Sequence, residues 1–317
     1  MALDVLTDIL ASLRLRGGVH FRCEFSAPWG MAMKPSAVAE FHLVTRGQCW
    51  LRLQRRKDVI PLLAGDVVVL PHGDPHALVD SPGGKALPAG KVLGHQNLEH
   101  YGPVVAGGGG IPAEILCGYF EFDRTARHPL VTALPRLIHV RTADAGEFEW
   151  LQTTMKFIGR ETREPGPGAD AVVRRLVEVL FIQVLRAYLR QVAMPQGILA
   201  ALADRQIGSA LGLIHGAPDK PWSLAGLGRQ VAMSRSAFAA RFARLVGQPP
   251  MEYLAHRRME RARELLRAGT LSTAAIAAAV GYQSEAAFGK AFKRITGSGP
   301  GAFRRHARRP GQRGRVQ

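Results

Sequence analysis

Cysteine is scarce in this chain of 317 residues: there are three, Cys23, Cys49 and Cys117, far apart in the sequence. They are too few and too scattered for a disulfide framework or a CxxC metal site. No apolar run is long enough to cross a bilayer, and the N-terminus lacks the basic, apolar and cleavage segments of a secretory signal. We therefore expect a cytoplasmic protein with no membrane partner, whose thiols stay reduced.

Acidic residues are scarce in the last third of the chain. Residues 218–317 carry 19 basic and five acidic side chains, whereas residues 1–140 carry 14 and 12, and residues 141–217 carry nine and eight. The last third thus holds 14 of the net charge of +17. A basic excess confined to one region predicts a polyanionic partner, with nucleic acid the first candidate. The alternative is a solvated surface kept positive for solubility.

The first part of the chain has almost no helical periodicity. Apolar and polar residues alternate over 40–54 around a turn at Arg46-Gly47, and again over 113–122. Residues 65–71 form a short apolar run between turn residues, and glycine- and proline-rich loops separate these segments. Many short strands of this kind predict a small antiparallel barrel or sandwich.

Helical periodicity begins after Asp123. Helices are predicted over 147–162, from Asp170 to about Val192, and from Arg205 onward with Asp204 as N-cap. The apolar residues of the second helix spread beyond one narrow stripe, so more than one neighbour must bury them. Packing within the chain and packing in a dimer both remain open.

One short segment occurs twice, 50 residues apart. The matched pairs are Ser234 and Ser284, Phe238 and Phe288, Phe242 and Phe292, Arg244 and Arg294, Gly247 and Gly297, and Pro250 and Pro300. A short helix is predicted before each copy, the serines can cap the second helix, and the phenylalanines can bury one face of it. Each repeat therefore predicts a helix-turn-helix, whose second helix enters a major groove of DNA.

A single helix is predicted between the two repeats. It has an apolar stripe and stops at Gly269. The stripe comprises Met251, Leu254, Met259, Ala262, Leu265 and Leu266. About 18 helical residues span about 27 Å, and successive major-groove faces of B-DNA lie about 34 Å apart. We call the second helix of each helix-turn-helix unit its reading helix. A connecting helix of this length could hold the two reading helices on adjacent turns of one duplex.

Residues 204–305 resemble the DNA-binding domain of the AraC/XylS-type transcription regulators. The marks of the resemblance are "WSLAGLGRQVAMSRSAFAARFARLVGQPPMEYL" and "AAAVGYQSEAAFGKAFKRITGSGPGAFRR". The resemblance implies seven helices and DNA binding by both units. Family members often carry a long basic side chain where Ala240 stands, and alanine cannot hydrogen-bond a base edge.

Projection of the two reading helices away from their phenylalanines gives the DNA-binding candidates. Those expected at the groove are Arg235, Ser236, Ala239 and Ala240 in the first unit, and Gln283, Ser284, Glu285, Ala286, Gly289 and Lys290 in the second. Those expected at phosphates are Arg244, Lys293, Arg294, Arg304 and Arg305. For any one of these charges the alternative is a merely solvated side chain.

Residues 65–76 fit the cupin pattern G-x5-P-x-G-x2-H through Gly65, Pro71, Gly73 and His76. The first part of the chain therefore resembles the cupin-like sensor domain of a subset of these regulators.

Enzymatic cupins hold a metal through H-x-H, a glutamate and the second-motif histidine. Here Val44 stands where the histidine after His42 would be, and Gln48 or Cys49 stands near the glutamate position, so two of the four usual ligands are missing. We expect no metal or other cofactor and no enzymatic activity. An unusual metal site at His42, His72, His76 and Cys117 is the alternative. The effector-binding candidates are His42, Trp50, His72, His76 and Cys117.

We therefore expect an α+β protein with four segments. These are an N-terminal cupin-like antiparallel β-barrel that senses an effector (1–140), a helical linker and candidate dimerisation segment (141–203), an all-α domain with two helix-turn-helix units (204–305), and a basic disordered tail (306–317). The expected function is sequence-specific transcription regulation, as an activator rather than a repressor, controlled by a small-molecule effector in the barrel. The expected partners are double-stranded promoter DNA, RNA polymerase and a second copy of the chain, at the nucleoid. The alternatives are a metal-dependent cupin enzyme fused to a DNA-binding module, and a DNA-binding protein whose barrel only dimerises.

Overall fold

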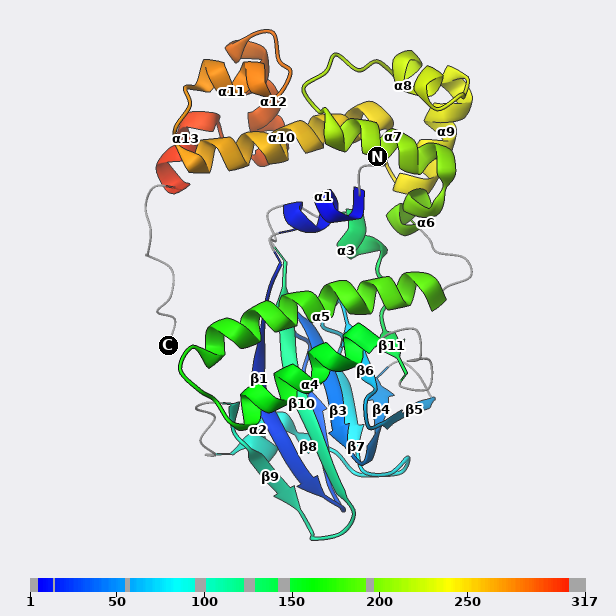
Figure 1. Ribbon diagram of the computed structural model, residues 1–317, viewed down its shortest axis with the longest axis vertical. Coiled ribbons are helices and arrows are strands. Elements are labelled where there is room, and N and C mark those ends of the chain that lie inside the picture. Colours follow the sequence, from blue (N-terminus) through cyan, green and yellow to red (C-terminus); the bar gives the residue numbers. More distant parts are fainter. Residues whose placement is uncertain are drawn as a thin grey trace. The chain divides into compact units, whose positions relative to one another are not determined.

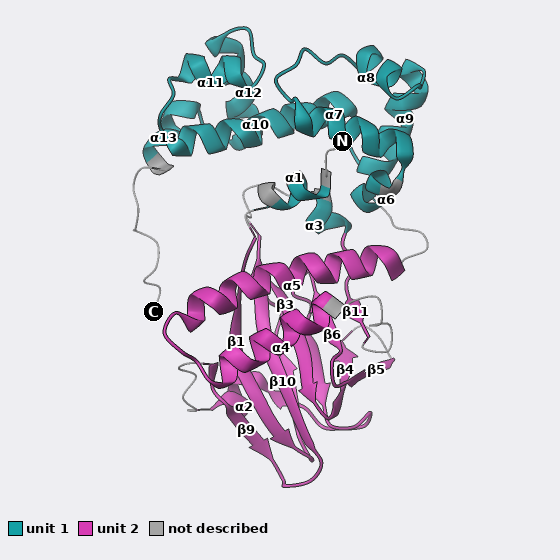
Figure 2. Cartoon of the chain, in the orientation of Figure 1, with its two compact units in different colours: residues 1–13, 124–133, 194–317 teal, residues 14–123, 134–193 magenta. Residues whose placement is uncertain are grey.

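The computed structural model describes residues 5–13, 15–54, 58–94, 101–122, 129–141, 149–191 and 197–307. The chain forms two compact units (Figure 2). One comprises residues 14–123 and 134–193 and is called the sheet unit below. The other comprises residues 1–13, 124–133 and 194–317 and is called the helical unit. Of the predicted tail 306–317, His306 and Ala307 end the last helix and the rest lies outside the described residues.

The sheet unit is built from two sheets (Figure 1). The first has the order β11-β6-β3-β10-β1-β9, formed by Ile138–Val140, Val67–Leu70, Ala39–Arg46, Pro112–Glu121, Arg16–Ser26 and Val104–Gly107. The second has the order β5-β4-β7-β2-β8, formed by Val59–Leu63, Gln48–Leu53, His76–Val79, Gly30–Met33 and Leu87–Pro88. The α+β cupin-like fold is as predicted, but the two sheets do not close into a barrel. In addition, β9 runs parallel to β1, and β8 runs parallel to β2.

The core of the sheet unit lies between the two sheets. Side chains alternate across each strand, so Val44 and Cys117 of the first sheet meet Cys49, Leu51 and Leu78 of the second in one buried cluster. The predicted turn glycines hold the loops of this unit. Gly73 has a φ of +65°, and a Cβ atom there would lie 2.3 Å from the Ser36 carbonyl oxygen. Glycine is therefore required at this cupin-motif turn.

Helices α4 (Glu149–Arg163) and α5 (Ala169–Gln191) belong to the sheet unit and lie along the first sheet (Figure 1). The Phe120 and Phe181 rings are 5.0 Å apart, and Gly17 of β1 leaves the space that the Val177 side chain fills. Packing within the chain therefore buries most of the apolar α5 residues. Val172 and Val179 remain 44% and 40% exposed. A short helix, α2 (Ala89–Leu93), completes the described helices of this unit.

The helical unit combines three short helices from elsewhere in the chain with seven from the C-terminal part. The three are α1 (Val5–Ser12), α3 (Pro129–Ala133) and α6 (Gly197–Ala203). Helix α1 contacts α7 (Arg205–Gly216), and Ile9 and Leu13 are buried. Helix α6 packs against α9 (Arg235–Val246). The residues expected as a linker thus divide between the two units: α4 and α5 lie in one and α6 in the other.

Seven helices follow Asp204, as predicted. The Asp204 carboxylate accepts hydrogen bonds from the Gln206 and Ile207 amides, as expected of an N-cap. After α7 come α8 (Leu224–Gln230), α9, α10 (Pro250–Ala268), α11 (Thr273–Ala279), α12 (Glu285–Thr296) and α13 (Pro300–Ala307). Among the helices of the described ranges, none combines the length and apolar character that a transmembrane span needs.

Candidate DNA-binding surface and buried histidine cluster

The two predicted reading helices are α9 and α12, and they match in length and at both ends. Each has 12 residues. At the start, the Ser234 and Ser284 hydroxyls accept hydrogen bonds from the amides three residues on, at 3.3 and 3.2 Å. At the end, Gly247 and Gly297 adopt left-handed conformations with φ of +84° and +83°. These caps are the local reason why the same sequence forms the same helix twice.

The paired phenylalanines fix which face of each reading helix turns outward. Phe238 and Phe242 are fully buried with ring centroids 5.6 Å apart, and Phe288 and Phe292 are fully buried at 5.5 Å. The two units differ at the turn before the reading helix. Both turns contain a residue with positive φ, but the residue differs: it is Ala232, with a φ of +54°, in the first unit and Gly281, with a φ of +78°, in the second.

Helix α10 connects the two helix-turn-helix units and packs against helices of both (Figure 1). Its 19 residues span about 28 Å at 1.5 Å per residue, and Gly269 ends it with a φ of +73°. Four stripe residues, Leu254, Met259, Ala262 and Leu266, are buried. Met251 is 38% exposed, so the predicted apolar stripe is wrong there. It lies in the first turn of α10, where the helix begins.

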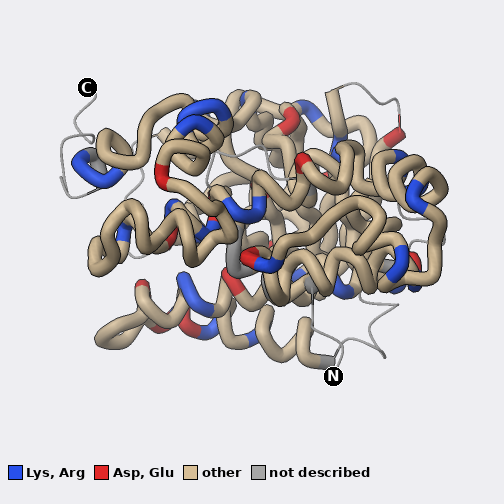
Figure 3. The backbone as a smooth tube through the Cα atoms, turned by 90° about the horizontal axis from the view of Figure 1, so that it is seen from above, with Lys and Arg blue, Asp and Glu red and all other residues tan. Residues whose placement is uncertain are grey.

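The outward faces of α9 and α12 carry most of the predicted DNA contacts. The exposed candidates are Arg235, Ser236, Ala240, Arg244, Gln283, Ser284, Glu285, Ala286, Lys290, Lys293, Arg294 and Arg305. Ala239 and Gly289 are half-buried, and a Cβ atom at Gly289 would meet nothing within 4 Å, which leaves room for close approach. Figure 3 shows the basic and acidic residues along the chain. Among the candidates of the second unit that are predicted to face the groove, Lys290 is the one that carries a cationic group.

Arg241 and Arg304 of the helical unit form hydrogen bonds with other parts of the protein. Arg241 on α9 binds the Asp204 carboxylate through Nε at 3.0 Å, which ties the first reading helix to the start of α7. Arg304, expected at a phosphate, is half-buried and donates to the Leu271 carbonyl oxygen at 2.7 Å. These contacts join elements far apart in sequence, so residue spacing could not show them.

Three of the five effector candidates meet in the core of the sheet unit. His42 Nε2 lies 2.7 Å from His76 Nε2, His42 Nδ1 lies 3.1 Å from Cys117 Sγ, and His76 Nδ1 donates to the Asp74 carbonyl oxygen at 2.8 Å. Burial and the neighbouring His76 lower the pKa of His42 well below its usual value. Burial lowers the pKa of His76 to about 4, against the opposing effect of the hydrogen bond to Asp74. Both imidazoles are therefore neutral near pH 7.

The other two effector candidates do not join this cluster. His72 is exposed, and its Nε2 bonds to the Leu134 carbonyl oxygen at 2.9 Å. Trp50 lies between Cys49 and Leu51 on β4, and those two point into the core, so alternation turns Trp50 to the other face.

Glu40 is a residue of this cluster that the sequence analysis missed. Its Oε2 lies 3.8 Å from His76 Nε2, and one ligand atom each from Glu40, His42 and His76 lie within 4.8 Å of one another. The signal was present, because residues two apart on a strand face the same side and Glu40 precedes His42 on β3 by two. Two histidines and a carboxylate are a donor set that suits a divalent transition metal. However, the 2.7 Å distance between the histidines is that of a hydrogen bond, and a chain of bonds from the Cys117 thiol through both imidazoles to the Asp74 carbonyl oxygen satisfies these atoms without an ion.

Two helix-turn-helix units with matching caps lie on one helix, α10, and the same chain carries a cupin-like sheet unit. The paired units define a DNA-binding protein. Residues 227–306 match a family described as a helix-turn-helix domain, and residues 4–190 match a family described as cupin. A putative AraC-like transcription regulator of Streptomyces lividans is 32% identical over 97% of this chain and 100% of its own length.

Two further relatives match along nearly the whole chain. The HTH-type transcriptional regulator AlkR of Acinetobacter baylyi is 30% identical over 96% of this chain and 100% of its own length. The RCS-specific HTH-type transcriptional activator RclR of Escherichia coli is 26% identical over 96% and 99%. The chain belongs to the AraC-like transcription regulators. It is a DNA-binding regulator and not an enzyme, which removes the alternative of a metal-dependent cupin enzyme.

Proposed function

We propose that this regulator activates transcription from promoters that both helix-turn-helix units contact, and that a small molecule bound by the sheet unit controls it. The observation that carries the proposal is the pair of reading helices with identical caps on the two ends of α10. The length of α10, about 28 Å, approaches the spacing of about 34 Å between successive major-groove faces. The place of action is then the nucleoid in the cytoplasm.

Activation requires a contact with RNA polymerase in addition to DNA. A role as an activator is supported by the relative RclR, whose name describes an activator. Control by an effector requires that the ligand bind two states of the protein with unequal affinity. The cupin-like unit is the candidate for this role, because relatives with the same two-part organisation are named regulators along their whole length. We propose that no metal takes part, since the His42–His76 pair is satisfied by hydrogen bonds.

A second copy of the chain is the proposed partner at α4. Trp150 and Phe157 are 76% and 55% exposed, and a separation of seven residues places them on the same face of that helix. Large aromatic side chains are enriched at protein interfaces. Full-length protein should sediment as a dimer at micromolar concentration, and Trp150→Glu/Phe157→Glu should sediment as a monomer. A monomeric wild-type protein would refute the dimer and leave DNA binding untouched.

Two substitutions on the reading helices test the DNA contacts. Lys290 lies exposed on α12, whereas Ala240 at the matching position of α9 offers no hydrogen-bonding group. Lys290→Ala should cost about 1–3 kcal/mol on the operator if it reads a base, or weaken all sequences and lower the salt slope by about one if it binds a phosphate. Ala240→Arg should tighten binding, because it adds a cation to the first reading helix.

Operator DNA for this test comes from genome-wide mapping of bound sites, and a scrambled duplex of the same length is the control. Affinity is measured for both variants at two salt concentrations. The proposed docking fails if Lys290→Ala changes binding to neither duplex and Ala240→Arg tightens binding to neither.

A further inference from the structure

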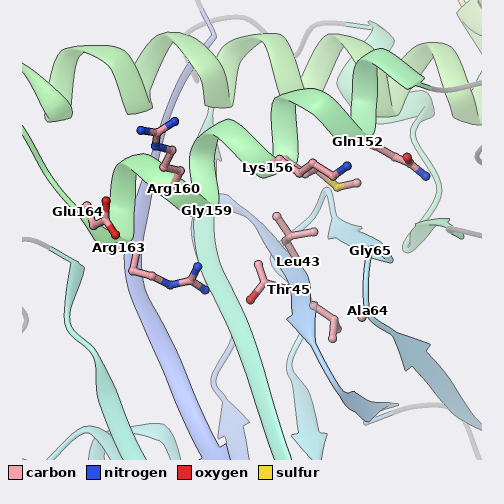
Figure 4. Close-up of a pocket in the computed structure, with 12 residues that line it drawn as sticks. Leu43, Thr45, Ala64, Gly65, Gln152, Lys156, Gly159, Arg160, Arg163 and Glu164 are labelled. Atoms are coloured by element: carbon pink, nitrogen blue, oxygen red, sulfur yellow. The ribbon is translucent and has the colours of Figure 1, made fainter.

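A hollow of about 460 Å³ lies within the sheet unit but outside its core, between helix α4 and the outer side of strand β3 (Figure 4). Leu43 and Thr45 of β3 and the turn at residues 64–65 line it on the sheet side, and Met155 lines it on the helix side. A volume of this size is within the range of small-molecule sites, about 300–1,000 Å³. It is separate from the histidine cluster, because His42 of that cluster points to the opposite face of β3 from Leu43 and Thr45.

Gly159 keeps this hollow open. It stands in the interior of α4, where glycine is among the least favourable residues. A Cβ atom built on it would meet only Thr45 Cγ2, at 3.9 Å, so the space in front of it is empty of other side chains. A larger residue at this position would project into the hollow.

The helix side of the hollow is cationic. Lys156, Arg160 and Arg163 all come from α4 and line it, and Glu164 is the acidic residue among its lining residues. Figure 4 shows Leu43, Thr45 and Ala64 on the sheet side, with the Arg163 side chain reaching toward them from α4 and the Arg160 side chain directed away from them. Arg163 is bound to Glu114 at 2.7 Å. Within the described part of the chain, no ion pair involves Lys156 or Arg160, and both are exposed.

We propose that this hollow binds an organic anion with an apolar body, and that this ligand class is the effector. The apolar sheet side buries the body of such a ligand, and the unpaired Lys156 and Arg160, which line the helix side, supply positive charge for its anionic group. An organic cation of the same shape would be repelled, and a small inorganic anion would gain nothing from Leu43 and Met155. The inference rests on the proposed function, and it places the effector beside α4 rather than among the effector candidates in the core.

A ligand at this place would couple to assembly through α4. It would touch both the helix and the sheet, so binding stabilises the arrangement in which α4 lies against β3. The same helix carries the exposed Trp150 and Phe157 of the proposed dimer interface. A ligand that holds α4 against β3 therefore shifts the equilibrium between monomer and dimer toward the state in which α4 lies against β3.

Two fluorescent probes with the same ring system test the ligand class on full-length protein. The anion is 8-anilinonaphthalene-1-sulfonate, and N-phenyl-1-naphthylamine is its uncharged counterpart. The anion should bind saturably with one site per chain and a Kd below about 100 µM. The double variant Lys156→Gln/Arg160→Gln should weaken binding of the anion about three- to tenfold, since exposed charges interact modestly, and should leave the uncharged probe unchanged.

Substitution of Gly159 tests the place. Gly159→Leu fills the hollow and should weaken both probes by about tenfold or more, because it removes the volume in which a ligand is buried. Gly159→Ala is the matched control: its methyl group makes only an ordinary contact with Thr45, so it should bind both probes like the wild type. Arg174→Gln/Arg186→Gln, on exposed positions of α5, controls for net charge and should have no effect. Thermal unfolding verifies that every variant is folded.

The proposal is overturned if the anion does not bind saturably, if Gly159→Leu leaves binding unchanged, or if the charge variants on α4 and α5 act alike. DNA affinity measured on the same preparations separates this failure from failure of the proposed function. Intact DNA binding with no probe site refutes the anion site alone. If the probe binds but changes neither DNA affinity nor sedimentation, the site exists and its role as the effector site is refuted.

Discussion

Ala232 and Gly281 occupy matching turns but differ in side chain. Both have positive φ, +54° and +78°, in the region that residues with a Cβ atom adopt at a cost of about 1–2 kcal/mol. The second helix-turn-helix unit has glycine at this turn, which adopts positive φ without the steric cost of a Cβ atom. The first unit has alanine there, which carries that cost. The two copies of the repeat are therefore not energetically equal at the turn.

Ala232→Gly should relieve this strain. We expect a gain of up to about 1 kcal/mol in the free energy of unfolding of the helical unit, since the greater freedom of glycine in the unfolded chain offsets part of the relief. Gly281→Ala should destabilise more strongly, because its Cβ atom would lie 2.4 Å from the Asp219 carbonyl oxygen. Chemical denaturation of both variants checks this. If Ala232→Gly destabilises the protein while Gly281→Ala is neutral, the turn geometry described above is incorrect.

His76 should make the stability of the sheet unit depend on pH. Its pKa is about 4 in the folded protein and about 6.5 in an unfolded chain. Above pH 6.5 neither state carries the proton, and the stability is complete. As the pH falls from 6.5 to 4, the unfolded chain gains a proton that the folded protein does not take. Stability is therefore lost across this window, by about 3 kcal/mol in total, and His42 acts in the same direction.

Urea denaturation between pH 7 and pH 4 measures this loss. His76→Gln should reduce the slope of stability against pH in that window, whatever its effect at pH 7. His72→Gln, at an exposed position of the same unit, controls for the loss of a histidine elsewhere. An unchanged slope in His76→Gln would show that this imidazole does not stay neutral in the folded protein.

At the scale of elements, helix α6 extends the DNA-binding domain beyond the boundary expected at Asp204. Ile198, Leu199 and Ala201 are at most 1% exposed, and α6 packs against the reading helix α9. A fragment that begins at residue 204 leaves this side of α9 uncovered. Compared with residues 194–307, residues 204–305 should be less stable by about 3 kcal/mol or more, the burial free energy of two large aliphatic side chains.

Denaturation and DNA binding of the two fragments check this boundary. The longer fragment should bind DNA with the steep salt dependence of a protein that neutralises several phosphates. The shorter one should bind only to the extent that it is folded. Equal stability of the two fragments would mean that α6 is a passive neighbour of α9.

The elements that the sequence predicted well are those with local causes. The caps at Ser234 and Ser284, the stop at Gly269, and the alternation around Arg46-Gly47 all depend on residues within a few positions of one another. Contacts between distant segments were not predictable in this way. Neither the contact of α1 with α7 nor that of α6 with α9 follows from the residues within those short helices.

The histidine cluster shows the same limit. His42 and His76 follow from a motif, but Glu40 does not, because the ligand pattern of enzymatic cupins starts at the first histidine and Glu40 precedes it. The hollow beside α4 could not be predicted at all. Gly159 looks like a weak point of an ordinary helix until Thr45 of a distant strand is seen opposite it.

At the scale of the whole molecule, charge and fold assign different tasks to the two ends of the chain. Residues 218–317 hold most of the net positive charge, and they contain both reading helices. The cupin-like part is close to neutral in formal charge and contains the histidine cluster and the hollow beside α4. A regulator needs both: a cationic surface for DNA and a separate place where a signal can bind.

We expect one chain to place its two reading helices on adjacent turns of one duplex. Hydroxyl-radical footprinting of the full-length protein on mapped promoter DNA tests it most directly, in the wild type, in Arg235→Ala of the first unit and in Lys290→Ala of the second. For each bound chain, we expect two protected segments centred about one helical turn, 10–10.5 base pairs, apart. Arg235→Ala should weaken one segment and Lys290→Ala the other. Protection of a single segment, or two variants that weaken the same one, would contradict it.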